Sequence, residues 1–330
     1  MGATDNHLLR AAWLCGDPGD RGSRIDVLSS LLVCPGCRSD LEPRAQELGC
    51  TSCGTVYEIA EGIPILRPVD PAGSDTQKAD QASFFDEADT EFEVSRPHGT
   101  PWFYRRLLAE KFRRSLDALS LPREGRMTAV TICGGSGMDA EFLACVGASV
   151  ISTDISLGAA QRTRERARRY GFDVLPVVAD AEALPLRDRS VDLLYVHDGL
   201  HHLASPQAGI REMLRTSRLA ISINEPARAG ATMLAARVGL SEHYEEAGNF
   251  IARLDPEALA SEVSAAGFEV VKNERYAMVY RHEPGLATRV LSQPVLRDVT
   301  VAALRAFNAV AGGIGNKLTL QAVRRPEPSS

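Results

Sequence analysis

The sequence predicts an α/β protein in which a small cysteine-rich domain precedes a doubly wound, mainly parallel sheet. Two closely spaced pairs of cysteines lie within residues 34–53. From residue 127 onward, short apolar runs alternate with segments of helical periodicity, which is typical of a parallel sheet with helices on both faces. The second and third of these runs end in Asp154 and Asp180, so both carboxylates should lie at one edge of the sheet.

The composition is that of an ordinary globular protein. Hydrophobic residues make up 44% and charged residues 24% of the 330 residues. The net charge of −6 predicts no general attraction to nucleic acid or to anionic membranes. The apolar stretch at 301–315 is interrupted by Arg305 and Asn308 and is too short to span a bilayer. The N-terminus shows no signal-peptide pattern, so we expect a cytoplasmic protein with no membrane partner.

The cysteine pairs have the spacing of a metal site. Residues 34–53 read CPGCRSDLEPRAQELGCTSC, which contains C-x2-C twice. Each pair can present two thiolates from one tight turn, and two such turns complete the tetrahedral four-thiolate shell that zinc prefers. We expect a structural zinc ion bound by Cys34, Cys37, Cys50 and Cys53. Free buried cysteines and an iron–sulfur cluster are the less favoured alternatives. Because so small a ribbon buries little apolar surface, the metal would supply its folding energy.

The run from LLVCPGC through CTSCGTVYEIAEGIPIL resembles small zinc-ribbon proteins. Such ribbons occur alone in bacteria and as activators of tRNA and release-factor methyltransferases. The run is also similar to the ribbon that precedes some rRNA guanine methyltransferases. This resemblance implies a connection with methyl transfer, although ribbons are widely reused.

The chain is expected to divide into three parts. Residues 1–68 hold the N-terminal segment and the ribbon, residues 69–80 form a polar linker, and residues 81–330 form the larger domain. Within 84–119, an aromatic start is followed by leucines and Phe112 at helical spacing. Five basic residues between 105 and 114 lie beside this stripe, and we interpret them as a solvated helix face in preference to a nucleic-acid-binding surface.

The elements of the larger domain follow from apolar runs, caps and glycine stops. Strands are expected at 127–133, 148–154, 172–180, 191–198 and 219–226, followed by a closing pair at 269–280 and 316–325. Helices are expected within 134–147, 156–171, 205–217 and 255–268. Pro176 cannot donate a backbone hydrogen bond, so the third strand should lie at the edge of the sheet.

Residues 80–325 resemble the class I S-adenosylmethionine-dependent methyltransferases. TICGGSG occupies the position of the family's glycine loop, VISTDIS that of its ribose-binding strand end, and VVADAEALPLRDRSVDLLYVHDGLHHL that of its adenine loop and fourth strand. The resemblance implies a Rossmann-like sheet of seven strands, the last of them antiparallel, and S-adenosylmethionine as cofactor. It assigns cofactor binding to Cys133, Gly134, Gly135, Gly137, Asp154, Ile155, Asp180, Ala181 and His197.

Two positions depart from the family pattern. Thr131 stands where the family usually has an acidic residue that helps hold the methionine amino group, and Cys133 replaces the first loop glycine. We expect an aromatic and basic N-terminal region to fold over the cofactor and supply the missing contact. Its residues are Phe84, Phe85, Arg96, His98 and Tyr104. A dehydrogenase cofactor is the runner-up, but GGSGMDA does not satisfy G-x-G-x-x-G.

The segment HDGLHH after the fourth strand bears on the acceptor. It lacks the Asn-Pro-Pro-Tyr type motif, which argues against DNA adenine or release-factor glutamine methylation. It is similar to LHHL-containing small-molecule methyltransferases, a resemblance that makes His201, His202 and Glu225 the candidate bases. Because adjacent helical residues diverge by about 100°, the two histidines cannot point at one atom. A structural or cofactor-contact role, or metal ligation, is the alternative.

The sequence therefore predicts a methyltransferase that O-methylates a small molecule, such as a secondary metabolite or a sugar, in natural-product biosynthesis. Segments 227–254 and 281–316 are expected as lids over the acceptor. The alternatives are an RNA-modifying methyltransferase whose ribbon binds RNA, an enzyme that uses S-adenosylmethionine for other chemistry, and a scaffold with a degenerate pocket. Nucleic acid is the less favoured partner, and the oligomeric state stays open, with a homodimer as one option.

Overall fold

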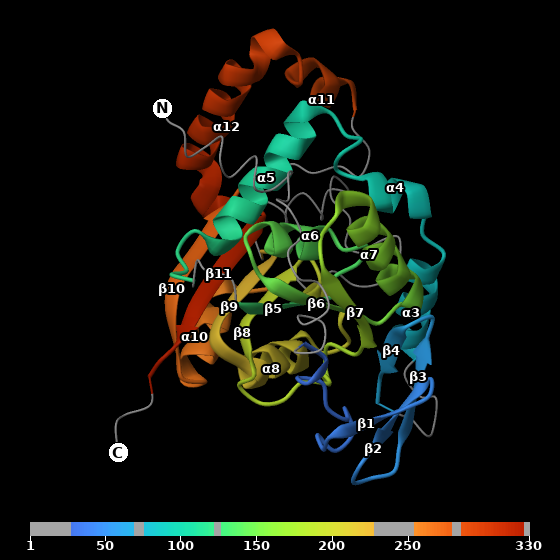
Figure 1. The fold of residues 1–330 in the computed structure, drawn as a ribbon. Helices are drawn as coiled ribbons and strands as arrows, with labels where there is room; N and C mark the ends of the chain where they lie inside the picture. The colour runs from blue at the N-terminus through green and yellow to red at the C-terminus, as the bar shows by residue number, and fades with distance from the viewer. Residues whose placement is uncertain (1–27, 69–75, 122–126, 228–253, 279–284, 327–330) are drawn as a thin grey trace.

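The protein is built around one sheet with helices on both of its faces (Figure 1). The structure, a computed structural model, describes residues 28–68, 76–121, 127–227, 254–278 and 285–326. Within these residues the sheet has eleven strands in the order β1-β2-β3-β4-β7-β6-β5-β8-β9-β11-β10. The seven strands from β7 to β10 are the Rossmann-like sheet expected from the sequence, and β11 runs antiparallel to β9.

The bounds of the elements agree closely with the predicted ones between residues 127 and 226. The strands of the main sheet are β5 (Thr128–Ile132), β6 (Ser149–Asp154), β7 (Val174–Ala179), β8 (Val191–His197), β9 (Ser217–Pro226), β10 (Phe268–Tyr276) and β11 (Lys317–Arg324). The helices that follow β5, β6, β8 and β9 are α6 (Met138–Cys145), α7 (Leu157–Tyr170), α8 (Pro206–Thr216) and α10 (Pro256–Ala265).

Capping residues explain where these helices begin and end. The Ser156 hydroxyl accepts a hydrogen bond from the Ala159 N–H, and Gly171 ends α7 with a left-handed φ of 71°. Ser205 caps α8 in the same way, with Pro206 at the first helical position. The helix starts could therefore be read directly from the sequence.

Apolar side chains bury both faces of the sheet. On one face, β5 and β8 pack against α5 (Trp102–Leu116) and α6 through residues such as Phe112, Phe142 and Tyr195. On the other face, α8 and α10 pack through residues such as Met213 and Val263. Every residue of β8 is buried, as expected for a central parallel strand.

The ribbon strands extend the main sheet. They are β1 (Leu41–Arg44), β2 (Glu47–Cys50), β3 (Val56–Ala60) and β4 (Ile63–Leu66). β4 lies parallel to β7, with Leu66 opposite Ala179. The prediction that β7 forms the sheet edge is therefore wrong for its carboxyl end, although Pro176 itself lies beyond the register of β4. Through β4, the ribbon thus supplies a parallel backbone partner to the main sheet.

Three helices connect the ribbon to β5, where the sequence predicted a linker and one aromatic-rich helical region. They are α3 (Thr76–Asp86), α4 (Thr90–Ser95) and α5. The last residues of the predicted linker, 76–80, belong to α3. The five basic residues of α5 do not form a solvated face, because Arg106 and Lys111 are buried.

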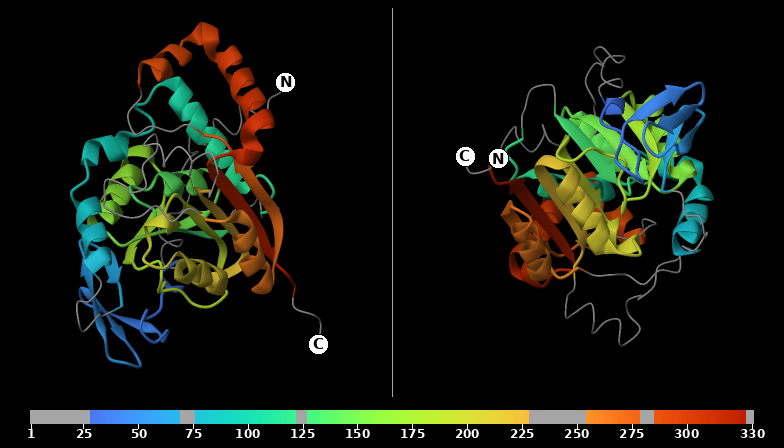
Figure 2. Two further views of the ribbon diagram at one scale, coloured as in Figure 1. Left: turned by 180° about the vertical axis from the view of Figure 1, so that it is seen from behind. Right: turned by 90° about the horizontal axis from the view of Figure 1, so that it is seen from below.

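The two predicted lids differ in what the structure describes. Of 227–254, residues 228–253 lie outside the described residues. Within 281–316 the chain forms α11 (Leu286–Leu291), α12 (Arg297–Ala311) and short 3₁₀ turns, and Figure 2 shows this hairpin projecting from the body. None of the described helices is long and apolar enough to cross a membrane.

Candidate active site

The four predicted metal ligands lie together. The sulfur atoms of Cys34, Cys37, Cys50 and Cys53 are all within 4.8 Å of one another. The Sγ atoms of Cys34 and Cys53 are 3.7 Å apart and those of Cys37 and Cys50 are 3.3 Å apart. Zinc–sulfur bonds of about 2.3 Å place tetrahedral ligand atoms about 3.8 Å apart, so this cluster fits a single zinc ion.

The glycine loop between β5 and α6 has conformations that only small residues accept easily. A Cβ atom at Gly134 would lie 2.4 Å from the Ser152 Oγ and 2.5 Å from the Thr131 Oγ1. Gly137 begins α6 with a φ of 83°. Cys133 takes a φ of 51°, which explains why the family prefers glycine there. Burial raises the pKa of the Cys133 thiol, so this side chain stays neutral.

Asp154, at the end of β6, is held by backbone groups of the loops around it. Its carboxylate accepts hydrogen bonds from the N–H of Gly135 at 2.9 Å and the N–H of Ser156 at 3.0 Å. Burial raises the pKa of this carboxyl, and these two N–H groups oppose that effect. Ile155, the next predicted cofactor residue, is half-buried. The carboxylate is thus fixed beside the glycine loop, as a ribose-binding group requires.

Asp180, at the end of β7, is paired with a residue that sequence reasoning did not single out. The Lys78 ammonium, from α3, lies 2.8 Å from Asp180 and 2.9 Å from Glu182. Burial would lower the pKa of Lys78, but the two carboxylates hold it above its usual range. Ala181 is buried beside them. Lys78 lies in the predicted linker, where no sequence pattern marks it as a functional residue.

Two arginines of α7 connect the glycine loop to the N-terminal helices. The Arg162 Nε donates to the Ser136 Oγ at 2.9 Å, and Arg162 also donates to the carbonyl of Phe85. Arg166 donates to the Ser136 carbonyl at 2.9 Å and forms a buried ion pair with Glu141 at 3.0 Å. The sequence showed only a basic helix, yet these side chains are buried against the turn that should hold the cofactor.

The five aromatic and basic residues that were expected to cover the cofactor do not form one cluster. The Phe85 ring packs edge-on to His202, with centroids 5.8 Å apart. Phe84 packs against Phe85. The other three are engaged elsewhere: Arg96 over the Phe92 ring, His98 on Glu141 and the Tyr170 ring, and Tyr104 in the core. Only the two phenylalanines thus lie near a predicted site residue.

His201 and Glu225 come together at the ends of β8 and β9. The His201 Nδ1 lies 2.7 Å from the Glu225 Oε2, and both side chains are buried. The other carboxylate oxygen, Oε1, accepts the N–H groups of Gly199 and Leu200 at 2.8 Å each. His202 turns differently, with its ring centroid 4.2 Å from that of His201 and its edge against Phe85. The structure therefore joins two of the three predicted catalytic residues.

His197, predicted to bind the cofactor, contacts groups of the chain itself. Its Nδ1 lies 3.2 Å from the Asp139 Oδ1, and its ring packs against Phe112. Its Nε2 lies 3.7 Å from Asp198. The His197 ring thus lies between the carboxylates of Asp139 and Asp198.

Asp198 is the centre of a charged cluster that the sequence did not reveal. Lys111 of α5 lies 2.5 Å and Lys317 of β11 lies 2.6 Å from its carboxylate oxygens. Burial alone would raise the pKa of Asp198, but the two ammonium groups hold it well below its usual range. Burial lowers the pKa of Lys111 to about 8. Because these three residues are far apart in the sequence, their spacing could not have predicted that they form a cluster.

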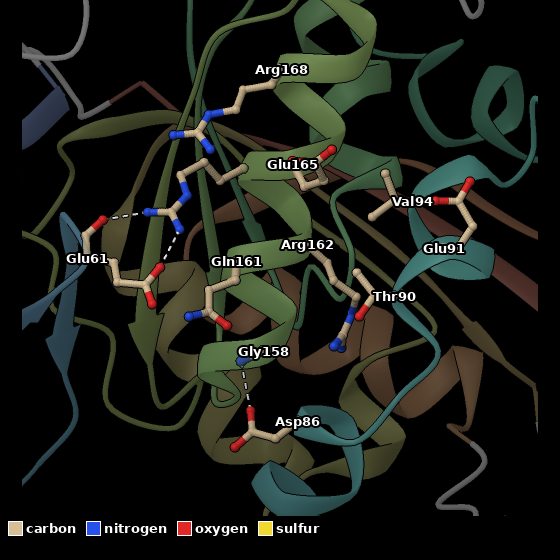
Figure 3. A pocket seen from close by; sticks show the side chains of 11 residues that line it. Glu61, Asp86, Thr90, Glu91, Val94, Gly158, Gln161, Arg162, Glu165 and Arg168 are labelled. Atoms are coloured by element: carbon tan, nitrogen blue, oxygen red, sulfur yellow. Dashed lines mark hydrogen bonds and ion pairs between the residues drawn. The ribbon is translucent and has the colours of Figure 1, made fainter.

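A surface pocket of about 460 Å³ lies elsewhere, along α7, α3, α4 and the turn after β3 (Figure 3). Its walls include Gln161, Arg168 and Asp86, and the Asp86 carboxylate accepts the Gly158 N–H at 2.8 Å. None of the predicted cofactor or acceptor residues lines it. We interpret it as the seam between the ribbon, the N-terminal helices and α7.

Comparison with known proteins identifies the family of the larger domain. Residues 130–218 match a family model described as a methyltransferase domain. A ubiquinone/menaquinone biosynthesis C-methyltransferase of Acidiphilium cryptum is 32% identical over 184 residues, which cover 48% of this chain and 73% of that protein. The chain belongs to the class I S-adenosylmethionine-dependent methyltransferase family.

Other members of the family match over shorter stretches. A demethylmenaquinone methyltransferase of Beutenbergia cavernae is 34% identical over 32% of this chain and 42% of its own length. A tRNA (guanine(10)-N2)-dimethyltransferase of Methanothermobacter thermautotrophicus is 31% identical over 36% of this chain and 34% of its own length. The chain thus spans less than half the length of these two relatives.

Among solved structures, a magnesium protoporphyrin IX methyltransferase of Synechocystis PCC 6803 with bound S-adenosylhomocysteine is 16% identical. The match covers 76% of this chain and 100% of that chain, with a TM-score of 0.49.

Proposed function

We propose that this methyltransferase transfers a methyl group from S-adenosylmethionine to a small acceptor with an ionisable hydroxyl group. The observation that carries the proposal is the buried pair of His201 and Glu225, 2.7 Å apart, where β8 and β9 end. In a doubly wound sheet this edge is where ligands bind. A histidine oriented by a carboxylate is the arrangement that general-base catalysis uses.

The contacts of Glu225 define the part that each nitrogen of His201 plays. Glu225 Oε2 accepts the Nδ1–H of His201, which makes Nε2 the atom that takes the acceptor's proton. The two backbone N–H bonds to Oε1 keep the carboxylate in place while the imidazole becomes charged. When bound, S-adenosylmethionine would supply the methyl group and leave as S-adenosylhomocysteine, while His201 would hold the proton that the acceptor oxygen loses.

The cofactor-binding part of the proposal rests on the other strand ends. Gly134 and Gly137 let the loop pack closely against Ser152 of β6 and Thr163 of α7. Beside this loop, Asp154 is positioned to accept two ribose hydroxyls. Asp180 and Ala181 line the loop where the family binds adenine. Cys133, Gly135, Ile155 and His197 stay predictions of the family resemblance.

We propose in addition that the four-cysteine cluster holds a structural zinc ion. Support comes from sulfur separations near those of a tetrahedral shell and from backbone N–H groups of Ser52 and Cys53, each 3.5 Å from the Cys50 Sγ. With four thiolates the shell is closed, so the ion would have no open position for catalysis.

The names of the relatives favour carbon as a second possible acceptor atom. Several are named as quinone C-methyltransferases or demethylmenaquinone methyltransferases. Deprotonating a phenolic hydroxyl raises the nucleophilicity of its oxygen and of the adjacent ring carbon. The same His201 base would therefore serve O-methylation of a secondary metabolite or sugar and C-methylation of an aromatic ring. In C-methylation the proton on the methylated ring carbon is lost afterwards, and the hydroxyl regains a proton.

The test uses methyl-deuterated S-adenosylmethionine and a metabolite extract from cells that lack the protein. We expect the label in one small molecule, and mass spectrometry with NMR would assign it to oxygen or carbon. Label recovered in RNA would overturn the proposal in favour of an RNA-modifying enzyme. Lack of S-adenosylhomocysteine binding by calorimetry would contradict both.

Single replacements of the two histidines then identify the base. We expect His201→Asn to lower kcat by about 10²–10⁴ and to abolish the acidic limb of the pH–rate profile. His202→Asn should act mainly on KM, because its ring packs against Phe85. Equal pH profiles for the wild type and His201→Asn would exclude His201 as the base.

A further inference from the structure

Helix α3 contacts the loops that follow β7 and β8. Its Lys78 ammonium is 2.8 Å from the Asp180 carboxylate and 2.9 Å from that of Glu182, both after β7. Two turns later, the Phe85 ring packs edge-on to His202, in the turn after β8. These contacts hold one face of α3 against the edge of the sheet where the cofactor is proposed to bind.

Gln81 lies between these two contacts and is buried on the same face of α3. It follows Lys78 by three residues and precedes Phe85 by four, the spacings that bring helical side chains together on one side. Gln81 is 5% exposed. The other margin of this face is marked by Asp86, whose carboxylate accepts the Gly158 N–H of α7 at 2.8 Å (Figure 3). The Gln81 side chain is therefore directed away from α7 and toward the loops after β7 and β8.

The side-chain amide nitrogen of Gln81 is buried without an acceptor. Among the residues that the structure describes, no group accepts a hydrogen bond from its Nε2. An unpaired buried N–H destabilises the folded chain, so folded proteins seldom keep one unless a ligand or a water molecule accepts the hydrogen bond. Because an apolar side chain could fill the same space without this penalty, the amide indicates a ligand with an acceptor atom at this place.

The neighbouring carboxylates indicate which part of S-adenosylmethionine would supply that acceptor. Asp154 is the proposed partner of the ribose hydroxyls, and Asp180 begins the loop where the family binds adenine. Adenine presents an amino donor at C6 beside ring nitrogens that accept. A carboxylate can only accept, which suits the amino group, whereas the ring nitrogen beside it needs a donor. Gln81 offers this donor one helical turn from the lysine that binds Asp180.

We propose that Gln81 binds the cofactor, with its side-chain amide donating a hydrogen bond to an adenine ring nitrogen beside the 6-amino group. This inference rests on the proposed binding of S-adenosylmethionine at this edge of the sheet. Lys78 is then a positioning residue, because its two ion pairs hold α3 against the loop after β7. Sequence reasoning did not single out Gln81, because it belongs to no motif and follows directly on the predicted linker.

Calorimetry with S-adenosylhomocysteine and a substitution that removes only the donor test this assignment. Gln81→Leu should lower the affinity about tenfold. It should not lower the melting temperature of the free protein, because an apolar side chain replaces an unpaired amide. Gln77→Leu is the matched control, since it makes the same change at an exposed position of α3 and should leave the affinity unchanged. If the leucine variant does not fold, Gln81→Met removes the donor with an unbranched side chain.

Deaza analogues of S-adenosylhomocysteine identify the contacted atom. The wild type should bind either the 1-deaza or the 7-deaza analogue about tenfold more weakly, and with that analogue Gln81→Leu should cause no further loss. With the 3-deaza analogue, whose missing nitrogen is remote from the amino group, Gln81→Leu should still cause its full loss.

Equal affinity of the wild type and Gln81→Leu for S-adenosylhomocysteine would overturn the assignment. So would a loss in Gln81→Leu that persists with both the 1-deaza and the 7-deaza analogue, or a lower melting temperature for both the leucine and the methionine variant. Failure of the wild type to bind S-adenosylhomocysteine would instead contradict the proposed function itself, so the two failures can be told apart.

Discussion

The two halves of the sheet's carboxyl edge hold their polar groups differently. The proposed cofactor half comprises the ends of β6 and β7. There Asp154 and Asp180 each accept a backbone N–H from two residues further along the chain. The Gly135 N–H and the Lys78 ammonium add one contact each, from the glycine loop and from α3.

The proposed acceptor half comprises the ends of β8 and β9. There the side chains of Lys111 and Lys317 bind Asp198. Glu225 binds the His201 ring and also two backbone N–H groups, all from the turn after β8. Part of the contacts of Asp154 and Asp180 could therefore be predicted from short sequence motifs. The contacts of Asp198 and Glu225 depend on how distant elements pack together.

After His201→Asn, the largest effect should come from Glu225→Gln, which keeps the size of the side chain and removes its charge. An amide cannot stabilise the imidazolium that forms when His201 takes a proton, so kcat should fall about 10²–10³-fold. Affinity for S-adenosylhomocysteine, measured by calorimetry, should change little. If kcat is unchanged while the affinity for S-adenosylhomocysteine falls, Glu225 contributes to cofactor binding and not to catalysis.

The next effect should come from Gly134→Ala in the cofactor half. The added Cβ would lie 2.4 Å from the Ser152 Oγ, so the loop must shift. We expect affinity for S-adenosylhomocysteine to fall about tenfold and stability to fall by about 1–3 kcal/mol. Gly147→Ala is the control, because it is strained at a φ of 97° but has nothing within 4 Å. It should lower stability without changing affinity.

Removal of the proposed zinc ion tests whether the ribbon supports the proposed cofactor half. The Val33 N–H, next to Cys34, donates to the Pro185 carbonyl at 3.0 Å, and the Arg187 N–H donates to the Leu31 carbonyl at 3.2 Å. These contacts hold the segment that follows Asp180. A chelator should therefore weaken binding of S-adenosylhomocysteine several-fold, measured by calorimetry. Cys34→Ser should already bind weakly and respond no further to the chelator. Unchanged affinity in both cases would mean that the segment keeps its place without the ribbon.

The same contrast explains what the sequence could predict. Hydrophobic periodicity, helix-capping residues and glycines at helix ends are local signals. The bounds of α7 and α8 are therefore almost those that the sequence predicts. The pairing of β4 with β7 was missed because an extra parallel strand depends on how the ribbon packs. Lys111 was interpreted as part of a solvated face, since only the packing of α5 reveals that its ammonium is buried against Asp198.

The last prediction concerns the pH dependence of stability and distinguishes the buried charge of Lys111, in the acceptor half, from a surface charge. The pKa of Lys111 is about 8 in the native state, below its value of about 10.4 in an unfolded chain. Between these pH values the unfolded chain binds one more proton than the native state, so this residue makes the free energy of unfolding rise with pH. The full rise amounts to about 3 kcal/mol.

Lys111→Met should remove that rise, while Lys317 still pairs with Asp198. The measurement is the free energy of urea unfolding from pH 7.5 to 10 for both proteins. Burial raises the pKa of Tyr195 and Tyr276, which opposes the rise at the alkaline end, but this contribution is common to both proteins and cancels in the difference. A constant difference across the range would show that Lys111 keeps its proton in the native state. The Lys111 ammonium would then behave as an ordinary ion-pair partner. The two halves of the edge would differ in where their contacts come from, but not in the titration of a buried lysine.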